Sequence, residues 1–164
     1  MMDISQQIKD KIYRLALSLL GSKEDAEDLT QEVIIKIWAK RHDGKNNQIT
    51  EALALKITRD LSLNILKHRK VKRKKHRIMM LRRANNGNEG NNYENKDLIA
   101  ITKGLIQQLP DMQRTVIHLR DIEGFEFEEI QQILEIDINA IRMNLSRARK
   151  KVRDELRNII NHGL

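Results

Sequence analysis

The sequence predicts an all-α protein with two small helical domains joined by a flexible linker. Apolar side chains recur at three- and four-residue spacing through most of the 164 residues, and no alternating strand pattern of useful length occurs. Aromatic residues make up only 3% of the chain, which is low for a sheet protein. Residues 84–97 are so rich in Asn and Gly that they offer almost nothing to bury, which predicts the linker.

The N-terminal domain, residues 1–83, is expected to contain three helices. The first ends at Gly21, because glycine tolerates the left-handed conformation of a helix C-cap. Ser22 and Asp25 have the spacing of a capping box, which starts the second helix. The polar stretch 41–47 is expected to be a loop, and Thr50 is the expected N-cap of a third helix that continues into the basic residues beyond it.

Apolar stripes define the inward faces that we expect on the second and third helices. The stripe of the second helix is Ala26, Leu29, Val33, Ile37 and Trp38. The stripe of the third helix is Leu53, Ile57, Leu61 and Ile65. Both have helical periodicity, so each helix should bury one face against its neighbours.

The C-terminal domain, residues 98–164, is expected to contain four helices. The first is stopped by Pro110, and the second ends near Gly124. A short third helix begins near Phe127, a turn follows at 135–137, and a long fourth helix completes the domain. Two domains of this size agree with the usual range for small helical units.

The net charge of +8 is distributed unevenly along the chain. Residues 67–83 hold ten Lys and Arg and no acidic residue, residues 84–137 carry a net −7, and residues 138–164 carry a net +5. The chain therefore has two basic poles, which suit two contacts with one polyanion such as nucleic acid.

Several classes of function are excluded by what the sequence lacks. It has no Cys, and therefore no thiolate metal site, disulfide or Cys nucleophile. Its five His are scattered, and no GxxxxGK[ST], GxSxG or HExxH motif occurs. We expect a non-enzymatic protein with no metal, cofactor or small-molecule substrate. It has no signal-peptide pattern and no apolar run near the ~20 residues that span a bilayer, so we expect it in the cytoplasm.

The end of the chain has a helix-turn-helix pattern, in which a short helix and a three-residue turn precede a long basic helix. The inward residues of that long helix leave seven candidates for DNA contact: Asn139, Arg142, Met143, Ser146, Arg147, Arg149 and Lys150. The first turns can read base edges, and the later cations suit phosphates. The alternative is a solvated basic face on an ordinary surface helix.

Residues 105–156 resemble the C-terminal region 4 domain of bacterial RNA polymerase sigma factors. The resemblance is carried by Leu109–Pro110 followed by Gln113–Arg114, by Glu123–Gly124, by Glu129–Ile130 and by the closing LSRARKK of residues 145–151. It implies that this domain binds the −35 promoter element. Two positions depart from the family pattern: Glu135 replaces the usual turn glycine, and Ala140 stands where Thr or Asn is usual.

Residues 25–38 resemble the polymerase-binding helix of the same family. The acidic residues Asp25, Asp28 and Glu32 share one helix face, and with Gln31 they can bind an Arg-rich partner. The resemblance implies that this face binds the β′ coiled coil of core RNA polymerase, and that the chain also contacts the β flap of the same enzyme. Taken alone, the acidic residues could instead serve only to favour the helix N-terminus.

Residues 57–70 resemble the promoter-reading helix of region 2, with Asp60 and Asn64 in exchanged order and Leu53 at the usual aromatic position. The family uses this helix and the loop before it to open the −10 element, and a flipped base is read by polar groups. The candidates for −10 contact are Asn46, Asn47, Gln48, Lys56, Arg59, Asp60, Asn64, Lys67, Arg69 and Lys70.

The two-domain layout resembles the extracytoplasmic-function (ECF) subgroup of sigma factors. It implies a protein that binds core polymerase and directs promoter recognition and transcription initiation on double-stranded and melted DNA, with an anti-sigma factor as a further partner. Two alternatives remain open. One is a stand-alone helix-turn-helix regulator that binds DNA as a dimer, and the other is an RNA-binding or membrane-surface protein driven by residues 67–83. Only the sigma factor interpretation explains the acidic helix at 25–38, because it gives that helix a binding partner.

Overall fold

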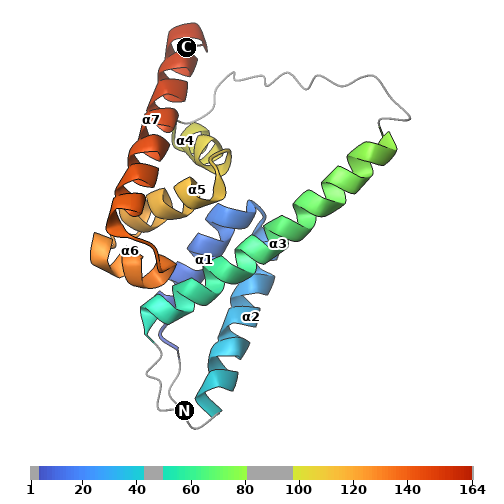
Figure 1. Ribbon diagram of the computed structural model, residues 1–164, viewed down its shortest axis with the longest axis vertical. Coiled ribbons are helices and arrows are strands. Elements are labelled where there is room, and N and C mark those ends of the chain that lie inside the picture. Colours follow the sequence, from blue (N-terminus) through green and yellow to red (C-terminus); the bar gives the residue numbers. More distant parts are fainter. Residues whose placement is uncertain (1–3, 43–49, 81–97, 164) are drawn as a thin grey trace.

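The computed structural model describes residues 4–42, 50–80 and 98–163 (Figure 1). Within these ranges the regular structure consists of seven α-helices and one π-helical turn, and no strand occurs. The all-α prediction is therefore confirmed. The segment predicted as a linker, residues 84–97, lies outside the described residues.

The N-terminal helices are α1 (Gln6–Leu20), α2 (Lys23–His42) and α3 (Glu51–Met80). Gly21 caps α1 in the left-handed conformation with φ 73°, as the sequence predicts. The Oγ1 of Thr50 accepts a 3.2 Å hydrogen bond from the backbone N–H of Leu53, so Thr50 caps α3. The helix continues through the basic stretch as expected, and its C-terminal part extends away from the rest of the molecule (Figure 1).

Two details of the N-terminal core differ from the prediction. Trp38 is 49% exposed, because Ile37 continues the inward row of α2 and the next residue is turned about 100° around the helix. On α3 the fully buried positions are Ala54, Leu55, Thr58 and Ser62, whereas the predicted stripe is only partly buried. The hydroxyls of Thr58 and Ser62 donate 2.8 Å hydrogen bonds to carbonyls four residues earlier, which makes their burial tolerable.

The C-terminal helices are α4 (Leu98–Gln107), α5 (Asp111–Ile117), α6 (Phe127–Leu134) and α7 (Ile138–Gly163). A π-helical turn, η1 (His118–Ile122), follows α5 and was not predicted. The carboxylate of Glu129 accepts a 2.7 Å hydrogen bond from the backbone N–H of Glu126, which starts α6. Ile130, Ile133, Ile141 and Ala148 are fully buried where α6 and α7 pack.

The two groups of helices pack against each other. Leu15 and Leu19 of α1 and Leu55 of α3 have no exposed surface, and they belong to the same apolar cluster as Val116 and Phe125 of the C-terminal half. Figure 1 shows α5 and α6 lying against α1 and the start of α3. The helices were predicted from local periodicity, which carries no information about this contact between them.

Candidate functional site

The exposed face of α7 holds all seven residues predicted for −35 contact. On the opposite face Ile141, Leu145, Ala148 and Val152 are buried against the domain. The side chain of Asp137 accepts a 3.3 Å hydrogen bond from the backbone N–H of Asn139 at the start of the helix. The α6–turn–α7 unit therefore has the helix-turn-helix arrangement, with its second helix open to a partner.

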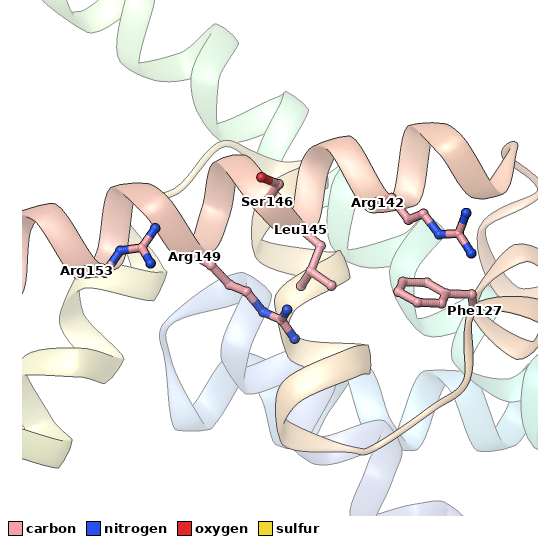
Figure 2. Close-up of a pocket in the computed structure, with 6 residues that line it drawn as sticks. All are labelled: Phe127, Arg142, Leu145, Ser146, Arg149 and Arg153. Atoms are coloured by element: carbon pink, nitrogen blue, oxygen red, sulfur yellow. The ribbon is translucent and has the colours of Figure 1, made fainter.

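A hollow of about 310 Å³ lies beside the exposed face of α7 (Figure 2). Its lining comprises Phe127, Arg142, Leu145, Ser146, Arg149 and Arg153. The guanidinium carbon of Arg142 lies 5.2 Å from the centre of the Phe127 ring, a cation–π contact that helps to hold it in place. Three guanidinium groups line the hollow, and that of Arg149 is paired with Asp121, so among the described contacts the positive charge without an acidic partner there is that of Arg142 and Arg153.

Arg153 also lines this hollow, and it was not among the residues predicted for DNA contact. It lies four residues beyond Arg149, so helical spacing places it on the same side of α7. Arg149 itself makes two hydrogen bonds to the carboxylate of Asp121, at 2.9 and 2.6 Å. These hydrogen bonds, which Asp121 accepts, raise the pKa of Arg149 and orient its side chain.

The acidic face of α2 is partly as predicted. Asp28, Gln31 and Glu32 are exposed. Asp25 instead makes a 2.7 Å ion pair with Arg69 of α3, and this partner lowers the pKa of the Asp25 carboxyl. The structure thus joins two residues that were predicted to contact different partners.

Two large apolar side chains lie on the same side of α2 as the three exposed polar residues. Ile35 is 66% exposed and Trp38 is 49% exposed. With Asp28, Gln31 and Glu32 they follow the i, i+3, i+4, i+7, i+10 spacing of one helix face. We call these five residues the α2 face. Neither apolar residue of the α2 face was predicted from the sequence. Trp38 was assigned to the core, and Ile35 was given no role.

The residues predicted for −10 contact are in three different situations. Asn46, Asn47 and Gln48 lie outside the described residues. Asn64 and Lys67 are exposed on α3, whereas Asp60 and Arg59 form a 2.7 Å ion pair with each other. The remaining cations face the C-terminal domain or α2.

Three cations of α3 have partners on the C-terminal helices: Lys56, Arg59 and Lys70. We call them the α3 cations. Lys56 is ion-paired with Glu135. Arg59 donates a 3.4 Å hydrogen bond to the carbonyl of Leu134, and Lys70 makes a 3.1 Å ion pair with Asp111. The α3 cations therefore already bind oxygen atoms of the chain itself.

The described ranges were also compared with the requirements of a metal site and of a membrane span, and they meet neither. There is no group of three or more His, Asp or Glu side chains there that could hold a metal ion. No helix of the same ranges is long and apolar enough to cross a membrane.

Comparison with known proteins gives independent information on the family. Residues 4–72 match the family described as Sigma-70 region 2, and residues 102–152 match the one described as Sigma-70, region 4. The chain is 31% identical to the ECF RNA polymerase sigma factor SigE of Mycolicibacterium smegmatis over 94% of its own length and 60% of that protein. It is 30% identical to the RNA polymerase sigma factor SigV of Bacillus subtilis, over 90% of this chain and 86% of that one.

A solved structure supports the same assignment. It is a co-crystal structure of the sigma factor RpoE with the anti-sigma factor NepR from Bartonella quintana, and it is similar to this chain with a TM-score of 0.65 and 25% identity over 93% of each chain. The resemblance drawn from the motifs is confirmed, and the stand-alone regulator is not favoured. This chain belongs to the sigma-70 family and is an RNA polymerase sigma factor of the ECF group.

Proposed function

We propose that this sigma factor binds core RNA polymerase through the α2 face and contacts promoter DNA with α3 at the −10 element and α7 at the −35 element. The observation that carries the proposal is the exposed face of α7, where all seven candidate contacts are accessible and the opposite side is buried. The chain performs no catalysis of its own and acts in the cytoplasm, where it directs the polymerase.

At the −35 element, α7 lies in the major groove with its N-terminal turns toward the bases. Arg142 is positioned to pair with a guanine, because its planar fork matches two acceptors on that base. Arg147 and Lys150 contact phosphates, which position the helix without reading sequence. Arg153, which lines the hollow beside Arg149, contacts one phosphate of the same backbone.

The α2 face binds the β′ coiled coil. Its carboxylates form charge-assisted hydrogen bonds with basic residues of the partner, and Ile35 and Trp38 supply buried apolar area. Exposed Trp side chains often contribute strongly to binding when a partner covers them.

The β flap has its own binding site on the C-terminal domain. We assign it to a groove of about 360 Å³ between α4, η1 and α7. The apolar part of its lining is Ile106, Ile117, Ile122, Val152 and Leu156. A groove of this composition suits the apolar face of a helix.

At the −10 element, the exposed Asn64 and Lys67 of α3 contact the opened strand, with Asn46, Asn47 and Gln48 from the preceding segment. Amide side chains suit the edge of a flipped base. An anti-sigma factor is a further partner, and the structural similarity to RpoE bound to NepR supports this part of the proposal.

In vitro transcription tests the proposed function. Core polymerase is supplied with a genomic template library, with and without this chain, and the transcript start sites are sequenced. We expect a set of start sites that depends on the chain and shares −35 and −10 elements. Tight, sequence-specific footprints by the chain alone, without new transcripts, would instead support a stand-alone regulator.

A further inference from the structure

We propose that Phe127 is a positioning residue for promoter reading, because its ring holds the Arg142 side chain in the orientation that pairs with a guanine of the −35 element. This inference rests on the proposed function, in which Arg142 reads a base. Phe127 acts through Arg142 and contacts no base itself. Its effect is to increase the preference of α7 for one base pair over the others.

The backbone of Phe127 is fixed by the start of α6. Phe127 is the first residue of this helix, and the preceding residue, Glu126, donates its backbone N–H to the Glu129 carboxylate at 2.7 Å. The Phe127 side chain is partly buried and packs against the apolar cluster that includes Ile130 and Leu145. An aromatic side chain has only two torsions to fix, so a ring anchored in this way is rigid.

Two guanidinium groups contact the Phe127 ring. The guanidinium carbon of Arg142 lies 5.2 Å from the centre of the ring, and that of Arg120 in η1 lies 4.9 Å from it. Figure 2 shows the ring and the Arg142 side chain next to each other at one end of the hollow. An aromatic face attracts a cation within about 6 Å of its centre. The ring therefore links η1 to the first turns of α7.

Arg120 is itself held in place. Its Nη1 donates hydrogen bonds to the carbonyl of Phe125 at 2.7 Å and to the carboxylate of Glu126 at 2.9 Å. Both acceptors come directly before Phe127 in the sequence, so Arg120 stabilises the segment that carries the ring. The Glu126 carboxylate also offsets part of the positive charge that Arg120 brings near Arg142.

A comparison with Arg149 shows why a ring suits a base-reading arginine. Arg149 lines the same hollow, but it donates two hydrogen bonds to the carboxylate of Asp121, at 2.9 and 2.6 Å. A cation–π contact uses the face of the guanidinium and leaves the N–H groups at its edge free. Within the described ranges the Arg142 side chain makes no hydrogen bond or ion pair. Arg142 is therefore oriented while its N–H groups remain available to the two acceptors of a guanine.

This orientation of Arg142 should increase specificity more than total affinity. An Arg side chain loses rotamer freedom when it pairs with a base, and the contact with the ring causes part of that loss before DNA binds. The pairing with two acceptors forms only on the matching base. The phosphate contacts proposed for Arg147 and Lys150 are the same on every sequence. The contribution of Phe127 should therefore appear on the matched site and be absent from mismatched ones.

The test uses holoenzyme assembled from core polymerase and the full chain. The −35 site is taken from the start sites found by in vitro transcription, and each of its base pairs is varied in turn. Phe127→Leu removes the ring and keeps an apolar side chain, and Phe127→Tyr restores the ring. Ile136→Val is the control, because it alters another partly buried apolar side chain of the same domain that has no ring.

We expect Phe127→Leu to reduce the ratio of affinities for matched and mismatched fragments about two- to fivefold, which corresponds to one exposed cation–π contact. The reduction should occur at the base pair where Arg142→Ala relaxes the preference. The log K–log salt slope should stay the same, because no charge is removed. Phe127→Tyr should restore the ratio, and Ile136→Val should leave it unchanged.

A double-mutant cycle separates positioning of Arg142 from general packing. In the Arg142→Ala background, Phe127→Leu should reduce the ratio no further, since the side chain that it positions is gone. Two outcomes would overturn the proposal. One is an equal loss of affinity on matched and mismatched fragments, and the other is an undiminished reduction of the ratio in the Arg142→Ala background.

Nuclear magnetic resonance of the free chain tests the contact without DNA. The Nε–Hε signal of Arg142, identified by its loss in Arg142→Ala, should shift in Phe127→Leu because the magnetic effect of the ring disappears. An unshifted signal would refute the positioning role.

Polymerase-dependent transcription by the unaltered chain separates this proposal from the proposed function. If transcription occurs and Arg142→Ala relaxes the preference while Phe127→Leu does not, the positioning role fails and the proposed function stands. If the unaltered chain supports no transcription, the proposed function fails, whatever the position of the Arg142 signal.

Discussion

The two helices predicted to read DNA differ in how much of their basic surface is available. On α7 the candidate contacts are exposed, and Arg149 alone among them has an acidic partner in the described contacts, Asp121 of the same domain. On α3 the cations Lys56, Arg59 and Lys70 bind oxygens of the other domain. A count of Lys and Arg does not distinguish these cases. Availability depends on which carboxylates the fold brings opposite each cation.

The largest effect should follow from breaking the proposed contact between the α2 face and core polymerase. We predict that Asp28→Lys together with Glu32→Lys weakens binding to core polymerase at least about 100-fold, because like charges brought together cost several kcal/mol. Both side chains are exposed, so circular dichroism should show an unchanged fold. Binding is measured by pull-down with core enzyme, and Glu27→Lys controls for added positive charge on α2. Unchanged capture of the double variant would refute the assignment of the α2 face.

The next effect tests whether α7 reads sequence as well as charge. We predict that Arg142→Ala costs about 1–3 kcal/mol on a matched −35 site and relaxes preference at one base pair. Arg147→Ala is the matched comparison: it should weaken binding to all sequences alike and reduce the log K–log salt slope by about 0.9. Titrations of core polymerase bound to each variant, on matched and mismatched fragments, separate the two. Equal losses on both fragments for Arg142→Ala would contradict base reading by this residue.

A third prediction concerns the domain contact at the end of α1. We predict that Gly21→Ala lowers the free energy of unfolding by about 1–3 kcal/mol, because of its positive φ and its approach to Gln107. Gly104→Ala is the control: it lies in α4 with no atom within 4 Å of the added Cβ, so it should stabilise by about 0.5–1 kcal/mol. Urea unfolding measures both. Adding Gln107→Ala to Gly21→Ala should recover part of the loss, and no recovery would mean that the steric contact is unimportant.

A fourth prediction is a pH dependence at Glu123. Burial alone would raise the pKa of this carboxyl, but the hydrogen bonds from Arg14 and His118 and their charges lower it from 4.5 to about 2. A lowered pKa means that the stabilising contribution is complete above about pH 4.5 and is lost as the pH falls toward 2. The difference in free energy of unfolding between the unaltered chain and Glu123→Gln should therefore shrink over that range. A difference that stays constant from pH 5 to pH 2 would show that Glu123 does not stabilise the folded chain through its charge.

The local elements could be predicted because their signals lie within a few residues of one another. Gly21 and Thr50 cap helices as expected, and α7 buries its predicted apolar row. Trp38 was assigned wrongly, because an apolar residue beside an inward position can equally lie on an exposed binding face. The inward face of α3 was also misjudged, since Thr58 and Ser62 are polar and their burial depends on hydrogen bonds to their own helix.

Periodicity, capping and motif spacing are local, so the helices, the family and the candidate binding residues could be predicted from the sequence alone. Which of those candidates have a partner within the described part of the chain depends on how the helices pack. Arg14 pairs with Glu123 across 109 positions and Lys56 with Glu135 across 79, and no local pattern encodes such pairs. Coulombic and apolar contacts depend on distance in space, so the packing of the N- and C-terminal helices decides whether a basic side chain faces solvent or its own chain.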